Sequence, residues 1–287
     1  MTTLRELVAE ELALPVDPRV TDMARAIAGK YGAASRAVLF YGSCLRQQQL
    51  EGLMLDFYLI VSDYREAYGK SWLVPANWLI PPNVFYFEHE GLVAKFAVLS
   101  EADFHRLNGP ETSSVSVWAR FAQPSRLVWA KDPAARERAV DAVSRAAPTL
   151  LAAAGVMDGE EPLDWWRRAF ALTYSAELRA ERKDRAGSVV DVDEHRYERF
   201  SLPAIAAMPV EHGRQPSWTV RRVEGKLLSV ARLAKASATF AGGADYIAWK
   251  INRHAGTDIQ LKPWQRRWPL LAAVSLLPRL LRSGAVR

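Results

Sequence analysis

Two short apolar segments on either side of a polar loop constrain the fold of this chain more than any other feature. Residues 36–42 read RAVLFYG and residues 54–62 read MLDFYLIVS, and both are rich in β-branched and aromatic residues. Such runs predict buried β-strands, and the glycine that ends the first run predicts a tight turn. The sequence therefore predicts two buried strands that flank a polar loop, with one acid, Asp56, near the start of the second strand.

The neighbouring segments predict a mixed α+β domain followed by helices. Residues 17–32 have helical spacing and end at a glycine, and residues 84–100 alternate around Glu90-Gly91 as a β-hairpin does. Residues 116–130 predict a helix, a break at Pro124 and a short strand, whereas 133–155, 162–183 and 219–254 each predict a helix. We expect an α+β domain at 1–131, a mainly helical domain at 132–256 and a basic amphipathic tail at 257–287.

Composition narrows the class of protein. The 287 residues are 49% hydrophobic, which is typical of a soluble globular protein, and include one cysteine, Cys44. A single cysteine excludes an intrachain disulfide and a cysteine-rich zinc site. The acidic N-terminal residues resemble neither a secretory signal nor a transit peptide, and no apolar run approaches the roughly 20 residues that span a bilayer. We therefore expect a cytoplasmic protein that does not cross the membrane.

Basic residues are concentrated in the C-terminal quarter of the chain. From Trp218 onward there are thirteen Lys or Arg against three Asp or Glu, a net charge of +10, whereas the whole chain carries +6. The preceding residues are therefore acidic, at −4. A local excess of cations predicts an anionic partner, which from charge alone is a lipid headgroup, a nucleic acid or a nucleotide.

The Gly-Ser pair after the first strand predicts a phosphate site together with Asp56. Gly42 permits a turn that brings backbone N–H groups against a phosphate, and Ser43 adds a hydroxyl donor. Asp56 could hold a divalent cation against phosphate oxygens, as nucleotidyl transfer requires. The alternative is an ordinary turn in which Asp56 caps a strand, because Gly-Ser at a strand end is common.

The pattern YGS at 41–43 followed by LDF at 55–57 resembles the nucleotidyltransferase fold and, more specifically, the mitochondrial-type phosphatidate cytidylyltransferases, also called the translocator assembly and maintenance family. The segments VAKFAVLS, WARFAQP and LTYSAELR resemble further family motifs. The residues that carry the resemblance are Tyr41, Gly42, Ser43, Arg46, Gln47, Met54, Leu55, Asp56, Phe57, Lys95, Arg120, Pro124, Tyr174, Ser175 and Arg179. Cys44 replaces a usual glycine, and the C-terminal residues match in basic character only.

The resemblance implies an enzyme that converts CTP and phosphatidate into CDP-diacylglycerol and pyrophosphate with Mg²⁺ or another divalent cation. It also implies a nucleotidyltransferase-like mixed sheet, a helical and possibly winged-helix-like second domain, and peripheral attachment to the inner face of the cell membrane. Asp56, Ser43 and Lys95 are then the expected catalytic residues, with Asp56 as the metal ligand. The expected nucleotide and phosphate ligands are Gly42, Ser43, Arg46, Arg120, Tyr174, Ser175 and Arg179.

Tyr58 stands where many nucleotidyltransferases have a second acid. A hydroxyl acceptor must lose a proton, whereas a phosphomonoester, whose second pKa is about 6, arrives already as an oxyanion. One carboxylate is then enough, and Lys95, Arg46 and Arg120 would offset the repulsion between two anionic reactants. Glu88 and Glu90 are candidates for a second metal ligand, or solvated positions of the hairpin.

Two predictions concern the second half of the chain. Ser175 and Arg179, at i and i+4 of a predicted helix with Tyr174, would close over the cytidine or the lipid phosphate, unless that helix only packs on the first domain. In the tail, Trp264, Arg266, Arg267 and Trp268 adjoin leucines and predict an interfacial segment, unless the leucines pack on the core. A nucleotidyltransferase with a non-lipid acceptor and a catalytically silent lipid- or nucleotide-binding module are the competing functions, and nucleic-acid binding is disfavoured.

Overall fold

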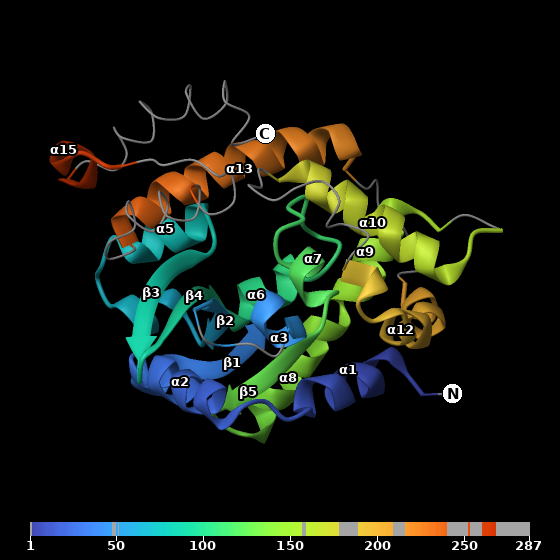
Figure 1. The fold of residues 1–287 in the computed structure, drawn as a ribbon, viewed down its shortest axis with the longest axis horizontal. Coiled ribbons are helices and arrows are strands. Elements are labelled where there is room, and N and C mark those ends of the chain that lie inside the picture. The colour runs from blue at the N-terminus through green and yellow to red at the C-terminus, as the bar shows by residue number, and fades with distance from the viewer. Residues whose placement is uncertain are drawn as a thin grey trace.

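The structure is a computed structural model that describes residues 2–47, 50, 52–156, 159–177, 189–208, 216–239, 252 and 260–267. Within these ranges, the side chains of residues 46–47, 237–239 and 266–267 lie outside the description. The described residues form a mixed five-stranded sheet with helices on both faces (Figure 1). This arrangement confirms the expected α+β class.

The sheet has the strand order β3-β4-β2-β1-β5. Its strands are β1 (Ser35–Tyr41), β2 (Met54–Val61), β3 (Asn83–His89), β4 (Leu92–Ser100) and β5 (Ser125–Ala130). Strands β2 and β4 are parallel, and the other neighbouring pairs are antiparallel. The predicted hairpin is confirmed, because Glu90 and Gly91 link β3 to β4 with φ values of 49° and 76°, as a tight hairpin turn requires.

One face of the sheet is covered by most of the helices. Its buried cluster joins strand residues such as Leu39, Tyr58 and Leu99 to helix residues such as Trp118 and Trp166. The helices that contribute buried residues to this cluster include α1 (Leu4–Ala13), α6 (Glu101–Leu107), α7 (Trp118–Phe121), α8 (Pro133–Ser144), α9 (Ala146–Ala154), α10 (Pro162–Ala176) and α12 (Glu194–Ala206). The predicted boundary at 131/132 falls between β5 and α8, and apolar packing continues across it.

The opposite face of the sheet packs mainly on α2 (Pro18–Gly29). Val38, Phe57 and Phe96 from the strands meet Met23 and Ile27 of this helix, and all five side chains are buried. The short helices α4 (Tyr64–Tyr68) and α5 (Leu73–Leu79) complete the cover between β2 and β3. Because neighbouring residues of a strand point to opposite faces, each strand contributes to both cores.

The helix predictions are right in position and less accurate in length. The helix predicted for 17–32 ends at Gly29, followed by a 3₁₀ turn at Gly32–Ala34. The single helix predicted for 133–155 is divided at Arg145 into α8 and α9. The helix predicted for 162–183 is wrong at its end, because α10 stops at Ala176 and Glu177 is extended. Capping side chains explain several starts, as at α8, where Asp132 accepts from the Ala135 N–H.

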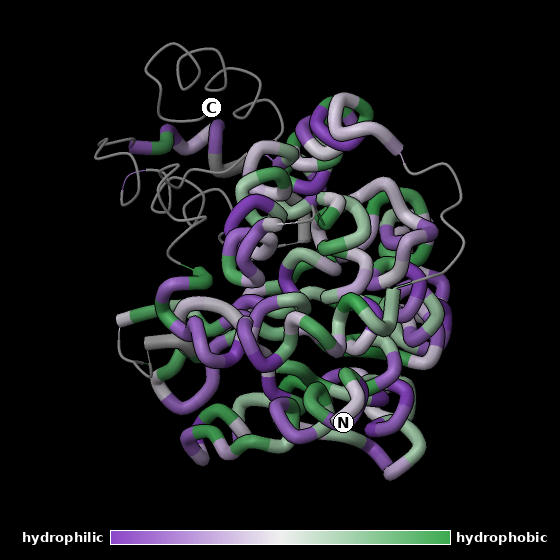
Figure 2. The backbone as a smooth tube through the Cα atoms, turned by 90° about the vertical axis from the view of Figure 1, so that its right-hand side faces the viewer, coloured by the Kyte–Doolittle hydropathy of each residue, from purple (hydrophilic) through white to green (hydrophobic). Residues whose placement is uncertain are grey.

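Helix α13 (Trp218–Thr239) passes over one side of the molecule from α10 to α5 (Figure 1). The short helix α15 (Pro263–Arg267) begins at a proline, a residue that is favoured at the first position of a helix. Figure 2, seen from the side of α10 and α12, shows hydrophobic and hydrophilic turns alternating along the chain. Among the described helices, none combines the length and apolar character that a bilayer-spanning segment needs.

Candidate functional site

Asp56 and Lys95 lie opposite each other on the parallel strands β2 and β4. The Lys95 Nζ is 2.9 Å from the Asp56 Oδ1, and the two side chains are 26% and 17% exposed. Both residues lie on the face covered by many helices, because Tyr58 and Ala97, two positions further along, belong to that core. Both charged groups are partly buried, and each gains its partner through this one ion pair.

Gly42 brings the backbone against this pair. Tyr41 is opposite Asp56 in the antiparallel β1–β2 ladder, and Gly42 follows it with a φ of +94°. A Cβ atom at position 42 would lie 2.8 Å from the Asp56 Oδ2. A side chain is thus excluded for two reasons, the backbone conformation and the close approach of the carboxylate.

Replacement of Gly42 by alanine tests this close approach. We expect Gly42→Ala to reduce the nucleotidyl transfer that the sequence predicts by more than its loss of stability explains, because the methyl group displaces the Asp56 carboxylate. Gly91→Ala is the matched control, since Gly91 has a φ of +76° and open space around its missing side chain. In both variants an alanine must adopt a positive φ, which lowers the free energy of unfolding by about 1 kcal/mol or more. Urea unfolding measures this loss. Equal turnover in the two variants would contradict the prediction.

Aromatic side chains pack against one another beside the Asp56–Lys95 ion pair. Tyr58 is 2% exposed, and its ring centroid is 5.3 Å from that of Tyr41 and 5.1 Å from that of Phe121. Burial raises the pKa of the Tyr58 hydroxyl above its ordinary value. The position where a second acid was considered is therefore part of the core, and a carboxylate there would be buried among aromatic rings.

Arg120, Glu177 and Arg232 form a second charged group near Asp56. The Glu177 Oε1 is 3.6 Å from Nη1 of Arg120 and 4.0 Å from Nη1 of Arg232, and the Glu177 side chain is 6% exposed. Burial alone lowers the pKa of Arg120, but Glu177, with Tyr58, Tyr41 and Asp56, raises it above its ordinary value. The two groups are linked by packing, because Tyr41, which is opposite Asp56 in the β1–β2 ladder, has its ring centroid 5.9 Å from that of Phe121, the residue after Arg120.

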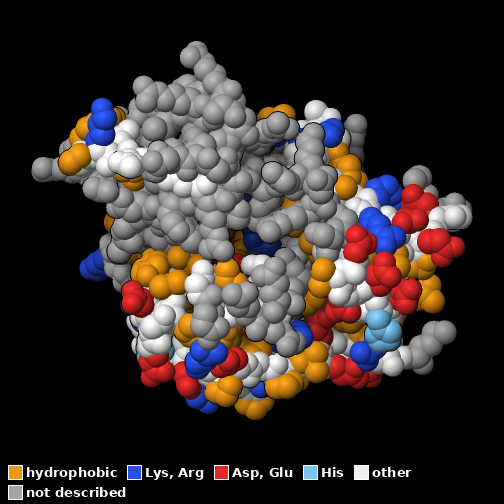
Figure 3. Space-filling view, in the orientation of Figure 1, with side chains coloured by type: hydrophobic (Ala, Val, Ile, Leu, Met, Phe, Trp, Pro, Cys, Tyr) orange, Lys and Arg blue, Asp and Glu red, His pale blue; other side chains and the backbone are white. Residues whose placement is uncertain are grey.

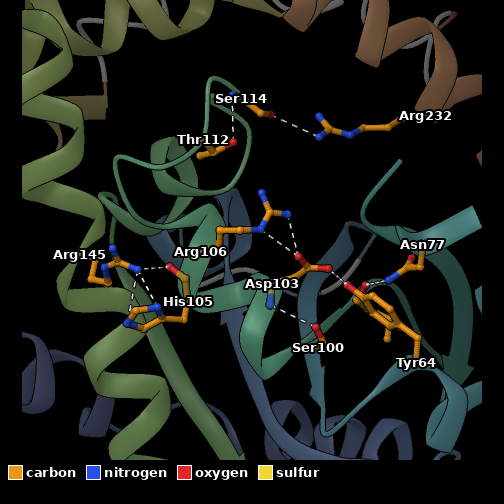
Figure 4. A network of polar contacts seen from close by, with 11 residues as sticks. Tyr64, Asn77, Ser100, Asp103, His105, Arg106, Thr112, Ser114, Arg145 and Arg232 are labelled. Carbon is orange, nitrogen blue, oxygen red and sulfur yellow. Dashed lines mark hydrogen bonds and ion pairs between the residues drawn. The ribbon is translucent and has the colours of Figure 1, made fainter. Parts of the chain in front are cut away.

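The cluster is held together by backbone carbonyls. Arg120 donates to the carbonyl and hydroxyl oxygens of Ser116 in the preceding turn. Arg232 donates to Pro81 O at 2.8 Å and to Ser114 Oγ at 3.4 Å, and Figure 4 shows it reaching from α13 to the loop after α6. Burial lowers the pKa of Arg232. The guanidinium groups are thus fixed before any ligand arrives.

The loop after α6 and the elements beside it are held by several further polar contacts. Arg221, which is 1% exposed, donates to the carbonyls of Thr112 and Ser113 at 3.2 and 2.8 Å. Figure 4 shows Arg145 meeting His105 at the other side of the loop and Asp103 meeting Tyr64. Lys235 donates to the carbonyls of Ala76 and Ile80 at the end of α5. Burial, with the charge of Arg232, lowers the pKa of Lys235 to about 7.

Gly225 permits α13 to cross the end of α10 closely. A Cβ atom at this position would lie 2.2 Å from the carbonyl oxygen of Ala176. Ala176 directly precedes Glu177, so this contact sets the position of the acid that lies between the two arginines.

Replacement of Gly225 by alanine is therefore expected to destabilise the protein by about 1–3 kcal/mol, because the added methyl group meets a backbone atom that cannot rotate away. Gly29→Ala is the control, since Gly29 is also helical and has open space around it. That variant should gain up to about 1 kcal/mol from helix propensity. Urea unfolding measures both changes, and two variants with the same midpoint would show that the crossing is not close.

The remaining predicted site residues have different surroundings. Ser43 is half-buried at the start of α3 (Ser43–Gln47), and Arg46 belongs to this helix with its side chain outside the described part. Cys44 is buried in the core, its Sγ 3.4 Å from Met54 O, so it serves as a small apolar residue. Glu88 and Glu90 are exposed on the hairpin, and no described contact joins either to Asp56.

Only part of the LTYSAELR segment lies near the Asp56 site. Tyr174 is half-buried against the core, and the exposed Ser175 donates to Leu172 O. Arg179 lies outside the described residues. The predicted i and i+4 helical face is wrong, because the chain is extended at Glu177. In the tail, Trp264 is 45% exposed, whereas the side chains of Arg266 and Arg267 and all of Trp268 lie outside the description.

Glu177, Arg232 and Lys235 are site residues that the sequence interpretation missed. Glu177 belongs to the quoted LTYSAELR segment, and Gly225 and Arg232 are seven residues apart in α13. A helical wheel puts them on one face, because seven residues are close to two turns. A glycine and cations sharing one helical face would have been the signal.

A divalent metal has one candidate protein ligand in this cluster. Among the described residues, no group of three or more His, Cys, Asp or Glu side chains is arranged to hold a metal ion. Mg²⁺ in nucleotide sites is commonly held by one or two carboxylates together with phosphate oxygens. Asp56 therefore fits a metal that arrives with a triphosphate.

The cluster gathers side chains from β2, β4, α7, the end of α10 and α13, which are far apart in the sequence. Its ion pairs include three cations and two acids, with Lys95 paired to Asp56, and Arg120 and Arg232 paired to Glu177. Comparison of the chain with models of known protein families gives no match, and comparison with curated proteins finds no relative.

Proposed function

We propose that the chain is a nucleotidyltransferase that transfers the cytidylyl group of CTP to the phosphate of phosphatidate. One observation supports this proposal most: Asp56 lies on a sheet beside a glycine turn, in a cluster whose ion pairs include three cations, Lys95, Arg120 and Arg232, and two acids, Asp56 and Glu177. Two anionic reactants need such an excess of positive charge. The mixed sheet is compatible with a nucleotidyltransferase fold, which is part of the proposal.

The reaction follows from the charge of the acceptor. An oxygen of the lipid phosphate attacks the α-phosphorus of CTP, the new P–O bond forms, and the bond between the α- and β-phosphates breaks to release pyrophosphate. A phosphomonoester is mostly dianionic at neutral pH, so no base has to remove a proton. This agrees with the aromatic surroundings of Tyr58, where a second carboxylate would be costly.

Each residue then has a task. The Gly42 turn and Ser43 bind phosphate oxygens, Lys95 and Arg120 balance the charge of the triphosphate, and Glu177 keeps Arg120 and Arg232 in place. Asp56 would hold Mg²⁺, which supplies charge neutralisation of the phosphates. Lys95 would move from Asp56 to the phosphates when they bind.

The test is an assay of the purified chain with each of the four nucleoside triphosphates, Mg²⁺ and vesicles that contain phosphatidate. We expect pyrophosphate release that depends on CTP and phosphatidate, and a CDP-lipid in the mass spectrum. Pyrophosphate release without a lipid product would indicate another acceptor. The absence of turnover with any nucleotide would indicate a binding module instead.

A further inference from the structure

An ordinary surface helix buries its apolar face. Helix α13 instead turns a polar face towards the protein and exposes an apolar one. Its inner face carries Arg221, Gly225, Arg232 and Lys235, which contact the loop after α6, the end of α10 and the end of α5. Its outer face carries large apolar side chains that are between 39% and 67% exposed: Val220, Val223, Leu227, Val230 and Leu233.

The exposed side chains form a continuous row along the helix. They are three or four positions apart, which puts them on one side of a helix with 3.6 residues per turn. An apolar groove of about 570 Å³ lies along the first part of this row, and its lining includes Val220, Val223 and Leu227 together with Glu224. Figure 3 shows hydrophobic side chains at the outer surface near the end of α13 that lies over α10. Contiguous apolar patches at a surface are common at interaction sites.

We propose that the outer face of α13 docks on an anionic lipid surface. Arg222 and Lys226 are exposed, four positions apart, and lie along one edge of the apolar row. A helix with an apolar face bordered by cations is typical of one that lies in the plane of a membrane interface. The choice of a lipid occupant rests on the proposed function, which requires access to a lipid phosphate.

The depth of such a helix agrees with the position of the site. An interfacial helix buries its apolar face to about 5–10 Å at the boundary of headgroups and acyl chains. Since a helix with its side chains is about 10 Å across, the inner face of α13 would lie at the level of the lipid phosphates. This face carries Arg232, which meets Glu177 in the site.

Helix α5 adds aromatic side chains beside the end of α13. The contacts of Lys235 with Ala76 and Ile80 join the two helices. Trp72, Trp78 and Leu79 on or beside α5 are each about half exposed or more. Tryptophan is enriched where one side of a ring is apolar and the other is wet, as at a membrane interface.

The experiment compares two leucine variants of the full chain by co-sedimentation with vesicles of phosphatidylcholine and phosphatidate, without CTP. Leu227→Gln changes the proposed face, and Leu202→Gln is the matched control, since both leucines lie on helices and both are 67% exposed. We expect Leu227→Gln to bind roughly tenfold more weakly, because burial of one leucine contributes that much. Leu202→Gln should bind as the unchanged chain does.

Three results would overturn the proposal. One is equal vesicle binding by the unchanged chain and Leu227→Gln. Another is a dimer of the unchanged chain that Leu227→Gln converts to a monomer without vesicles, which would make a second copy the occupant. The third is a loss of thermal stability in Leu227→Gln but not in Leu202→Gln, which would mean that the face packs on the chain itself.

Activity measurements separate this proposal from the proposed function. Leu227→Gln should turn over phosphatidate in detergent micelles at the rate of the unchanged chain and lose rate only on vesicles. Vesicle binding that depends on Leu227, in a protein that makes no lipid product, would leave the docking face established and remove the proposed reaction.

Discussion

Asp56→Asn is expected to lower the rate of pyrophosphate release from CTP and phosphatidate on the order of 10²-fold or more, even at saturating Mg²⁺. Asparagine keeps the shape of the side chain and removes the negative charge that faces Lys95 at 2.9 Å. The loss should be in turnover, because the charge of Asp56 acts on the phosphate that changes in the reaction. Steady-state kinetics with phosphatidate vesicles measure this change.

Glu88→Gln is the matched control for Asp56→Asn. Glu88 lies on β3, two strands away, and its exposed side chain accepts a hydrogen bond from Tyr86 at 3.3 Å. We expect this variant to keep its activity, since no described contact joins Glu88 to the site. Full activity of Asp56→Asn would remove Asp56 from the reaction, and an equal loss in both variants would place a second acid ligand on the hairpin.

Glu177→Ala is expected to lower the free energy of unfolding by about 3 kcal/mol. It should also reduce the rate of pyrophosphate release from CTP and phosphatidate. The side chain is 6% exposed and lies between two arginines, so its removal leaves buried positive charge without a partner. Urea unfolding followed by circular dichroism measures the stability. Glu177→Gln should lose less stability, because the amide oxygen still accepts from the guanidinium groups.

Glu194→Ala provides the comparison for Glu177→Ala. Glu194 meets Arg167 at 2.8 Å, but its side chain is 50% exposed, and an exposed ion pair contributes at most about 1 kcal/mol. The two glutamates have the same chemistry and differ mainly in burial. If both variants unfold at the same urea concentration, Glu177 does not hold the arginine pair.

The sequence predicted the parts of the fold that depend on local pattern. The strands β1 and β2, the β3–β4 hairpin and the break at Pro124 were recognisable because strands alternate and turns need particular residues. Lys95 was identified through the resemblance of its strand to a family motif, and its position inside an apolar strand requires a partner for the ammonium. The ends of helices were harder, as at Arg145 and Ala176, where packing on neighbouring elements decides the length.

The second charged group of the site depends on contacts between distant segments. Glu177 acquires its role because α13 crosses α10 at Gly225, and helical period does not say which element a helix crosses. The usual rule that the apolar side of a helix is buried gives the wrong face for α13. Arg232 is thus identified by the tertiary structure, although its spacing from Gly225 is visible in the sequence.

The pairing of Asp56 with Lys95 has a consequence for the accuracy of folding. A shift of β2 by one residue would turn Asp56 to the opposite face of the sheet, where Phe40, Phe57 and Phe96 are packed. An unpaired carboxylate among these rings would be costly, so misaligned strands are disfavoured from the moment the sheet forms. The acid that we propose as the metal ligand thereby also fixes strand alignment, and a chain that lost it would have less to distinguish correct from shifted pairing of two apolar strands.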